Sequence, residues 1–314
     1  MAFRGSFGVV AVIAACIALI VGVAPAKADP LPVSFNFFSG IPNEIAHPGG
    51  SLPGSNDFSC KPSAQHPNPV VLVHGTGGSQ QTNWGTYVPL LKNEGFCVFA
   101  LTYGAAGAAF PLSAIGGMGR MEDSAAELGS FIGRVLVATG ARKVDVIGHS
   151  QGTILPAYYA KYLGGKDKID KYVSLAPAWN GTTVAGTDLI LPFARRLGIG
   201  PDQFPICRAC GQLDPSSPFL RKLRAGGYYL PTIQYTNIAT RYDELIVPYW
   251  SGLPNGGRNV RNIVVQEGCS VDFTEHAGVA GSRRAATFVL NALDPEHQRR
   301  VPCDRAAPFS GSPF

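Results

Sequence analysis

The sequence predicts a single α/β domain in which a mostly parallel central sheet carries helices on both faces. Three observations support this fold class. Apolar runs of strand length recur along the chain, segments with apolar residues at helical spacing separate them, and the earliest runs are apolar at every position. Continuous hydrophobicity, rather than alternation, is typical of parallel strands that are buried on both faces.

The first 28 residues are expected to be a secretory signal peptide rather than part of the fold. Arg4 gives a positive start, residues 9–23 form an apolar core, and Ala26-Lys27-Ala28 offers small residues for cleavage. An uncleaved membrane anchor is the alternative, but the apolar run is shorter than the roughly 20 residues that span a bilayer. Cleavage after Ala28 would leave a secreted or cell-envelope protein that begins at Asp29.

Charge and length exclude some classes of partner. The net charge of +5 falls to +3 once Arg4 and Lys27 are removed (5 − 2 = 3), and no cluster of basic residues suggests a nucleic acid partner. No later apolar stretch is long enough to cross a membrane. We expect a monomer with an N-terminal arm at residues 29–67 and one domain at residues 68–314, which carries an insert at residues 177–231.

Six of the seven cysteines follow the signal peptide. An even number in an exported chain indicates disulfides, although six cysteines allow fifteen pairings. Position in the chain favours three bridges, namely Cys60 to Cys97, Cys207 to Cys210 and Cys269 to Cys303. A redox motif or half of a zinc site is the alternative for Cys207 and Cys210, but no histidine or further cysteine lies nearby in sequence.

The expected elements alternate along the chain after an extended, proline-rich arm that wraps over the domain or forms its rim and carries no recognisable chemistry. Strands are expected at residues 69–75, 96–103, 144–147, 171–176, 232–240 and 260–266, and helices at residues 84–95, 121–138, 150–163 and 282–293. Pro156 lies beyond the first turn of the third of these helices and is placed to bend it. The insert interrupts the alternation and is rich in proline and glycine.

The third strand is joined to the next helix through Gly148-x-Ser150-x-Gly152. A strand that reverses into a helix within about two residues leaves no room for side chains at positions 148 and 152, and both are glycine. Ser150 at the apex would have a strained backbone and an exposed hydroxyl. A chance match is the alternative in a chain with 38 glycines. A serine nucleophile also requires a histidine base and a carboxylate.

The partners of Ser150 are expected after later strands, because reactive groups gather outside the carboxyl ends of parallel strands. Asp243 follows the fifth predicted strand, and His276 follows the sixth. Of the six histidines, only His276 lies in a loop after a late strand. Glu244 is the nearest rival acid, and a solvated loop residue is the alternative for either partner. The order Ser150, Asp243, His276 is the one expected of an α/β-hydrolase.

Backbone N–H groups that would stabilise the oxyanion of the reaction are expected at two positions. The residue after the nucleophile, Gln151, supplies the first. The glycine-rich turn His74-Gly-Thr-Gly-Gly78 supplies the second from Thr76, whose hydroxyl offers a third donor. The alternative is a tight turn that Thr76 caps without any catalytic role.

Together these residues resemble the secreted bacterial class 2 lipases of the α/β-hydrolase superfamily, and more distantly the small fungal lipases with a Thr-Gly-Thr oxyanion turn. The likeness covers roughly residues 70–280 and rests on Val73-His-Gly-Thr-Gly77, Gly148-His-Ser-Gln-Gly152, Leu175-Ala-Pro-Ala-Trp-Asn-Gly-Thr182, Asp243 and His276. The resemblance implies an α/β-hydrolase fold with a cap or lid-like insert, disulfides of the kind proposed above, and ester hydrolysis on lipids. Thr153 stands where family members often carry a second glycine.

The expected function is a secreted carboxylic-ester hydrolase that acts on lipid esters, at a lipid-water interface, through an acyl-enzyme on Ser150. His276 would serve as the base and Asp243 would orient it, and no metal or organic cofactor is needed. Two alternatives are an acyltransferase that uses the same triad and an inactive fold that serves as a surface-binding module. The apolar piece of the insert at residues 189–193 is expected to form the wall or lid of the acyl site, with a structural cap as the alternative.

Overall fold

The computed structural model describes residues 1–2, 29–182 and 207–308. The chain divides into two compact units, Met1–Pro30 and Leu31–Phe314. The helices and strands described below belong to the second unit. Most of the expected signal peptide and the apolar piece at residues 189–193 lie outside the described residues. Within the part of the chain that is described, no helix combines the length and apolar character that a membrane span requires.

Six strands form one parallel sheet in the order β2-β1-β3-β4-β5-β6. They are β1 (Val70–Val73), β2 (Val98–Leu101), β3 (Val144–His149), β4 (Ile169–Leu175), β5 (Gln234–Ala239) and β6 (Val260–Val264). The chain runs from β1 outward to β2 and then returns to the other side of β1 with β3. Such a reversal of strand order leaves a crevice at the carboxyl ends of the strands. The predicted fold class is confirmed.

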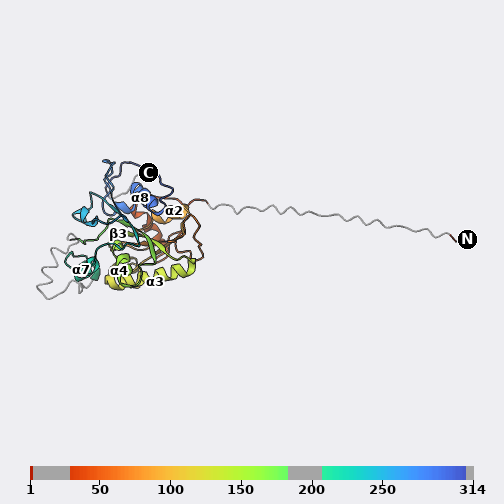
Figure 1. Ribbon diagram of the computed structural model, residues 1–314, viewed down its shortest axis with the longest axis horizontal. Helices are drawn as coiled ribbons and strands as arrows, with labels where there is room; N and C mark the ends of the chain where they lie inside the picture. The colour runs from red at the N-terminus through yellow and green to blue at the C-terminus, as the bar shows by residue number, and fades with distance from the viewer. Residues whose placement is uncertain (3–28, 183–206, 309–314) are drawn as a thin grey trace. The chain divides into compact units, whose positions relative to one another are not determined.

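Helices cover both faces of the sheet. Alternate residues of the central strands point to opposite sides, and because these residues are apolar, both faces must be buried. The longer helices are α2 (Tyr87–Asn93), α3 (Met121–Thr139), α4 (Leu155–Tyr162) and α8 (Arg283–Leu293). Val71 and Val73 of β1 belong to a core shared with α3 and α4, whereas Val70 and Leu72 belong to a core shared with α2 and α8. Figure 1 shows the two pairs of helices on opposite sides of the sheet.

Helix α4 begins later than the sequence predicted. The chain after β3 first forms a 3-10 turn, η3 (Ser150–Thr153), and the α-helix starts only at Leu155. Pro156 therefore lies in the first turn of the helix, where a missing backbone N–H removes no hydrogen bond. The prediction that Pro156 bends the helix is wrong, because the elbow delays the start of the helix.

The N-terminal arm differs from the extended segment that was expected. It contains a 3-10 turn, η1 (Phe37–Gly40), and a short helix, α1 (Ile41–Ala46). Gly40 packs directly on the chain that follows β1, since a Cβ at this position would lie 2.0 Å from the carbonyl oxygen of Gln81. The arm is thus packed against the segment between β1 and α2.

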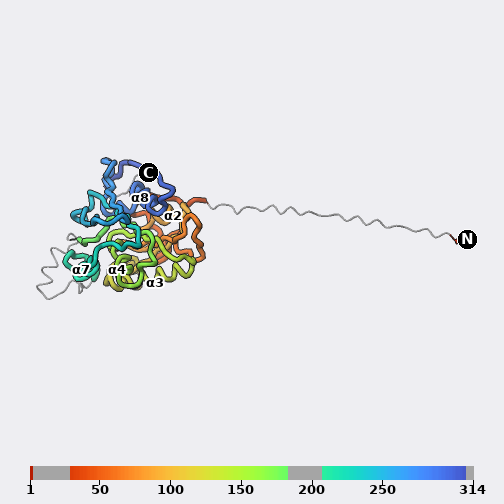
Figure 2. The backbone as a smooth tube through the Cα atoms, viewed as in Figure 1, coloured from red at the N-terminus to blue at the C-terminus, as the bar shows by residue number. Residues whose placement is uncertain are grey.

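The described part of the insert holds two short helices, α6 (Arg208–Gln212) and α7 (Pro218–Arg224). Helix α7 packs on α4, where the rings of Phe219 and Tyr158 stack with their centroids 5.1 Å apart. Figure 2 shows α7 beside α4 along the backbone trace. Residues 177–182 and 207–231 contribute no strand to the sheet.

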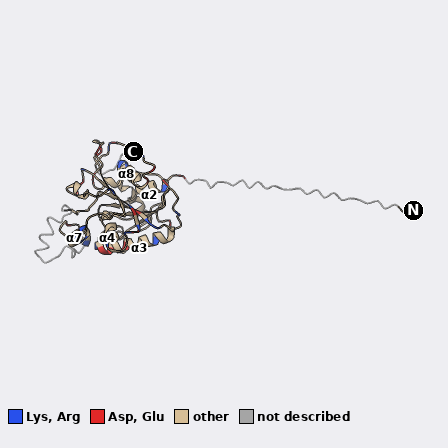
Figure 3. Cartoon of the chain, in the orientation of Figure 1, with Lys and Arg blue, Asp and Glu red and all other residues tan. Residues whose placement is uncertain are grey.

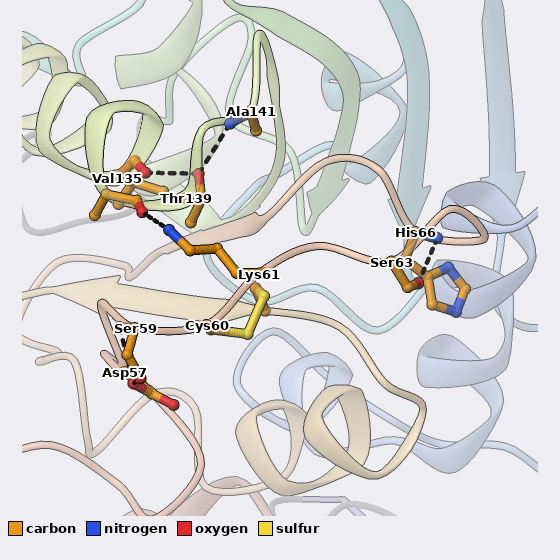
Figure 4. Close-up of a disulfide and its surroundings, with 11 residues drawn as sticks. Asp57, Ser59, Cys60, Lys61, Ser63, His66, Val135, Thr139 and Ala141 are labelled. Carbon is orange, nitrogen blue, oxygen red and sulfur yellow. Dashed lines mark hydrogen bonds between the residues drawn. A yellow bond between two sulfur atoms is a disulfide. The ribbon is translucent and has the colours of Figure 1, made fainter.

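Three disulfides join the pairs that position in the chain favoured, Cys60–Cys97, Cys207–Cys210 and Cys269–Cys303. The Cys60–Cys97 bridge fastens the arm to the residue that precedes β2. Beside this bridge, Lys61 Nζ donates a hydrogen bond to the carbonyl oxygen of Ala138 at 2.6 Å, close to the end of α3 (Figure 4). The C-terminal part of the arm is therefore held to the sheet and to α3.

Candidate active site

Ser150 lies at the sharp turn between β3 and η3 and has a left-handed backbone, with φ of +54°. A positive φ is strained for a residue that carries a Cβ. The positions two residues before and after Ser150 have no room for a side chain. A Cβ at Gly148 would lie 2.3 Å from the carbonyl oxygen of Gly152, and a Cβ at Gly152 would lie 2.0 Å from that of Val73. The backbone around Ser150 thus has the tight geometry that the sequence pattern predicted.

Ser150, His276 and Asp243 lie in a row of hydrogen-bonding contacts. The Nε2 atom of His276 is 2.9 Å from Ser150 Oγ, and its Nδ1 atom is 2.8 Å from Asp243 Oδ1. A neutral His276 with its proton on Nδ1 donates to Asp243 and accepts from the serine hydroxyl, which is the arrangement of a general base. The three predicted residues come from the loops after β3, β5 and β6, and the structure brings them together.

The neighbouring carboxylates of Asp243 and Glu244 contact different parts of His276. Asp243 Oδ1 faces the ring and also accepts hydrogen bonds from the backbone N–H groups of Leu245, at 3.0 Å, and Ile246, at 2.7 Å. Glu244 Oε2 accepts from the backbone N–H of His276 at 3.1 Å. Asp243 is therefore placed to orient the ring, whereas Glu244 holds the loop that carries it.

Thr76 and Gln151, the two expected oxyanion donors, are hydrogen-bonded to each other through their side chains. Thr76 Oγ1 donates to Gln151 Oε1 at 2.5 Å. Gln151 occupies the first turn of η3, where backbone N–H groups have no partner within the helix. The turn that carries Thr76 is closed by a hydrogen bond from Gly78 N–H to the Gly75 carbonyl, at 3.1 Å. The side-chain bond therefore holds the two expected donors together, with Gln151 next to Ser150 in the chain and Thr76 lining the same cavity as Ser150.

The hydroxyl of Thr76 is not free to act as a third donor in this arrangement, because its one proton is directed at Gln151 Oε1. The Nε2 atom of Gln151 is buried and has no hydrogen-bond partner among the described residues. If the amide turned by half a rotation, Nε2 would donate to Thr76 Oγ1 and the hydroxyl proton would be released toward the substrate. The predicted third donor therefore depends on the orientation of this amide.

Two polar residues to which the sequence analysis assigned no role, His149 and Asn83, line the cavity together with Ser150 and His276. His149 Nε2 is 2.9 Å from the carbonyl oxygen of His276, and His149 Nδ1 is 3.0 Å from Asn83 Oδ1. Burial lowers the pKa of His149 to about 3, so the ring is neutral near pH 7. The position of His149 next to Ser150 was the only signal for it in the sequence. Nothing in the sequence marks Asn83.

The side chain of His74 is hydrogen-bonded to the backbone of the glycine-rich turn. It is fully buried, and its Nδ1–H donates to the carbonyl oxygen of Gly75 at 2.7 Å. Its Nε2 atom accepts a hydrogen bond from the backbone N–H of Tyr103 at 3.2 Å, and the two rings stack with centroids 4.1 Å apart. Burial lowers the pKa of His74 to about 4. A neutral ring with its proton on Nδ1 satisfies both contacts.

A cavity of about 700 Å³ lies against Ser150 and His276. Its apolar walls come from the arm (Phe37, Phe38, Ile41 and Ile45), from the loop before α3 (Phe110 and Ile115) and from the loop after β5 (Leu245 and Ile246). Thr182, Cys210 and Leu213 of the insert also line it. A cavity of this size with few polar groups fits an acyl chain or a similarly apolar group.

A buried carboxylate anchors the wall that the arm forms. Glu44 of α1 is only 3% exposed and accepts hydrogen bonds from the Ser79 hydroxyl, at 2.6 Å, and from the backbone N–H of Gly49, at 2.8 Å. Ser79 directly follows the glycine-rich turn. The arm, in which the sequence showed no recognisable chemistry, thus places α1 beside the turn and in the wall of the cavity.

The described residues offer no metal centre. Within residues 29–182 and 207–308, no group of three or more His, Cys, Asp or Glu side chains is arranged to hold a metal ion. Cys207 and Cys210, for which half of a zinc site was the alternative, are bonded to each other.

Comparison with known proteins places the chain in a protein family. A family model for class 2 lipases matches residues 67–286. Among solved structures, lipase B from Aspergillus fumigatus matches with a TM-score of 0.56 and 19% identity, over 80% of this chain and 57% of that chain. This chain thus spans little more than half of the Aspergillus protein. A soluble variant of monoglyceride lipase from Saccharomyces cerevisiae, in complex with a substrate analogue, matches with a TM-score of 0.54 and 14% identity, over 74% of this chain and 86% of that chain. At these identities the two likenesses show the fold.

Proposed function

The chain belongs to the class 2 lipase family of ester hydrolases, and on that premise we propose that it is exported and hydrolyses lipid esters through an acyl-enzyme on Ser150. The observation that carries the proposal is the row of Asp243, His276 and Ser150, with contacts of 2.8 Å and 2.9 Å, beside an apolar cavity. Such a row activates a serine hydroxyl, and such a cavity accepts an acyl chain.

In the acylation step, Ser150 Oγ attacks the ester carbonyl carbon while His276 Nε2 takes the hydroxyl proton. The backbone N–H groups of Gln151 and Thr76 stabilise the oxyanion that forms. The tetrahedral intermediate then loses the alcohol, which takes the proton from His276 as the ester C–O bond breaks. Asp243 keeps the ring oriented and offsets its positive charge while it is protonated.

In the deacylation step, water attacks the acyl-enzyme and His276 takes a proton from it. Collapse of the second intermediate releases the fatty acid and returns the proton to Ser150 Oγ. An acyltransferase would use an alcohol at this point in place of water. The two activities share every earlier step, so they differ only in which acceptor reaches the acyl-enzyme.

The test uses the exported chain that begins at Asp29. We expect it to hydrolyse dissolved esters of graded chain length and to be labelled by a fluorophosphonate probe on the peptide that contains Ser150. Ser150→Ala should abolish labelling and lower turnover by on the order of 10⁶-fold. Ser130→Ala, which changes an exposed serine on α3, is the matched control and should behave like the wild type.

Three outcomes would contradict parts of the proposal. A folded protein that is not labelled and turns over no ester would be a surface-binding module rather than an enzyme. Transfer of the acyl group to an added alcohol, faster than release of the acid, would make the protein an acyltransferase. A mature N-terminus other than Asp29 on the exported protein would contradict the assigned cleavage site.

A further inference from the structure

His149 has one proton to share between two oxygen atoms. Its Nε2 faces the carbonyl oxygen of His276 at 2.9 Å, and its Nδ1 faces Asn83 Oδ1 at 3.0 Å. The orientation of the Asn83 amide is fixed by Gly75, whose backbone N–H donates to Oδ1 at 3.1 Å and would clash with an amide NH₂ group. Both ring nitrogens of His149 therefore face acceptors, although a neutral imidazole donates from only one nitrogen.

The carbonyl oxygen of His276 is the acceptor that depends on this proton. His276 is 4% exposed, and among the described residues no other N–H or O–H group donates to its carbonyl. Asn83 Oδ1, in contrast, already accepts from Gly75. A buried carbonyl without a donor costs more free energy than the loss of a second hydrogen bond to an amide oxygen. The proton of His149 therefore belongs on Nε2.

With this proton, side chains hold both backbone polar groups of His276. Glu244 accepts from its N–H at 3.1 Å, and His149 donates to its carbonyl. His149 is also the residue immediately before Ser150, at the end of β3. Its ring is confined on another side by the edge of Phe37, with centroids 5.8 Å apart. The loop of His276 is thus tied to the same backbone that positions the Ser150 hydroxyl.

We propose that His149 is a positioning residue that donates a hydrogen bond from Nε2 to the carbonyl oxygen of His276 and so keeps His276 within proton-transfer distance of Ser150. The proposal rests on the proposed function, in which His276 is the base. A neutral ring suits this role, because it adds no positive charge beside His276 when His276 takes the serine proton. A small displacement of the base is costly, since proton transfer requires a contact close to the 2.9 Å that is observed.

Two substitutions of His149 by amide side chains distinguish the role of Nε2 from that of Nδ1. The side-chain nitrogen of Gln reaches the place of a histidine Nε2, whereas that of Asn reaches only the place of Nδ1. We expect His149→Gln to keep the donor to His276, and His149→Asn to lose it. With a dissolved short-chain ester, kcat of His149→Gln should exceed kcat of His149→Asn by about tenfold or more, with KM similar in both. Fluorophosphonate labelling of Ser150 should slow in parallel with kcat.

His66 provides the matched control. It is 7% exposed, its ring stacks on Phe96 with centroids 3.8 Å apart, and it does not line the cavity. The substitutions His66→Gln and His66→Asn should give equal kcat values, because the His66 ring is not in contact with His276 or with the cavity. A purely structural role for His149 would likewise make its two variants equal in kcat.

Nitrogen NMR of the His149 ring provides a readout that does not require activity. In the inactive Ser150→Ala protein, Nε2 should carry the proton and Nδ1 should not. A proton on Nδ1, or a His149→Asn variant more active than His149→Gln, would overturn the proposal in favour of a bond to Asn83. Equal kcat values for the two His149 variants would overturn it as well. If wild-type protein failed to react with the serine probe, the proposed function would fail, while the NMR result would still decide which atom His149 donates from.

Discussion

The hydroxyl of Thr76 donates its proton to Gln151 Oε1 at 2.5 Å, so the two residues expected to stabilise the oxyanion are joined before any substrate arrives. This bond connects the turn after β1 with the first turn of η3, across the point where the strand order reverses. Donors that are fixed in advance need no reorganisation during the reaction, which is why they stabilise a transition state effectively. The bond also means that the hydroxyl and the backbone N–H of Thr76 have different tasks.

Replacing Thr76 with Val keeps the backbone N–H and the shape of the side chain but removes the hydroxyl. If the hydroxyl only holds Gln151, kcat on a dissolved ester should fall by about tenfold, and Thr76→Ser should restore it. If the Gln151 amide turns and the hydroxyl reaches the oxyanion, the loss should be about 10² to 10³-fold, as for a direct donor. Steady-state kinetics of the two variants therefore distinguish the two amide orientations, and an unchanged kcat in Thr76→Val would contradict both.

The two carboxylates beside His276 should respond differently to conversion into amides. Asp243→Asn can keep an oxygen that accepts from His276 Nδ1–H but removes the negative charge that stabilises the protonated ring, so kcat should fall by about 10³ to 10⁴-fold. Glu244→Gln keeps an oxygen that accepts from the His276 N–H, and kcat should fall by less than about tenfold. The measurement is kcat on one dissolved ester for both variants. Near-normal activity in Asp243→Asn together with an inactive Glu244→Gln would show that the acid has been wrongly assigned.

The arm should influence the length of the acyl chain that the protein accepts. Phe38 and Ile41 line the cavity, and α1 is held in place by Glu44. Removing apolar side chains from this wall takes away contact area that only a long chain reaches. The double variant Phe38→Ala, Ile41→Ala should lose several-fold in kcat/KM on octanoate esters and much less on acetate esters. Val137→Ala, at a highly exposed apolar position on α3, is the control and should not change the ratio.

Asp145 should make stability depend on pH without affecting the active site. It lies in β3 near the opposite end of the strand from Ser150, and Lys171 Nζ is 3.4 Å from its Oδ2. Burial outweighs this ion pair and raises the pKa of Asp145 to about 6, from an ordinary value of 3.8. The folded state therefore binds the proton more tightly than the unfolded state. As a result, the free energy of unfolding contributed by this group falls as pH rises from about 4 to about 6.

Asp145→Asn tests this sign. The amide oxygen can still accept from Lys171 N–H, which lies 3.0 Å from Asp145 Oδ1. The buried histidines titrate in both proteins and cancel in the comparison. In urea unfolding between about pH 4 and pH 7, the stability of the variant relative to the wild type should rise with pH, by about 1 to 3 kcal/mol in total. A relative stability that falls with pH would mean that the ion pair with Lys171 outweighs burial.

The strands and the candidate catalytic residues could be located from the sequence because each rests on a local pattern. Continuous apolar runs such as Val70–Val73 mark buried parallel strands, and Asp243 and His276 were found by their positions after such runs. Helix α1 was not predictable, because it is too short to show periodicity and occurs among prolines. The contact of His149 with Asn83 joins residues that are 66 positions apart, and its contact with His276 joins residues that are 127 positions apart. A single sequence gives no local signal for contacts over such distances.

Charged residues are rare in the loops that form the apolar walls of the cavity. Figure 3 shows charged residues on α3 and α7. Residues 104–119 contain no Asp, Glu, Lys or Arg, and residues 36–46 contain only the buried Glu44. The composition of the loops thus matched the cavity that they form, but the sequence alone did not indicate that these loops lie together around Ser150.

The last prediction concerns the disulfide that lies next to the loop of His276. Cys269–Cys303 joins residues 34 positions apart, and the C-terminal segment also pairs with the loop through a hydrogen bond from Phe273 N–H to the Ala306 carbonyl, at 3.0 Å. Cys60–Cys97 has a similar separation of 37 but ties the arm to β2. Replacing either pair with serine should therefore lower the free energy of unfolding by a similar amount, roughly 3 to 4 kcal/mol, because the closed loops are nearly equal in length. Well below the melting temperature, however, only loss of Cys269–Cys303 should lower kcat, because only that bridge restrains the residues leading to His276.

The measurement is kcat of the two folded variants, together with their unfolding in urea. Equal kcat values would mean that Cys269–Cys303 stabilises the chain without positioning His276.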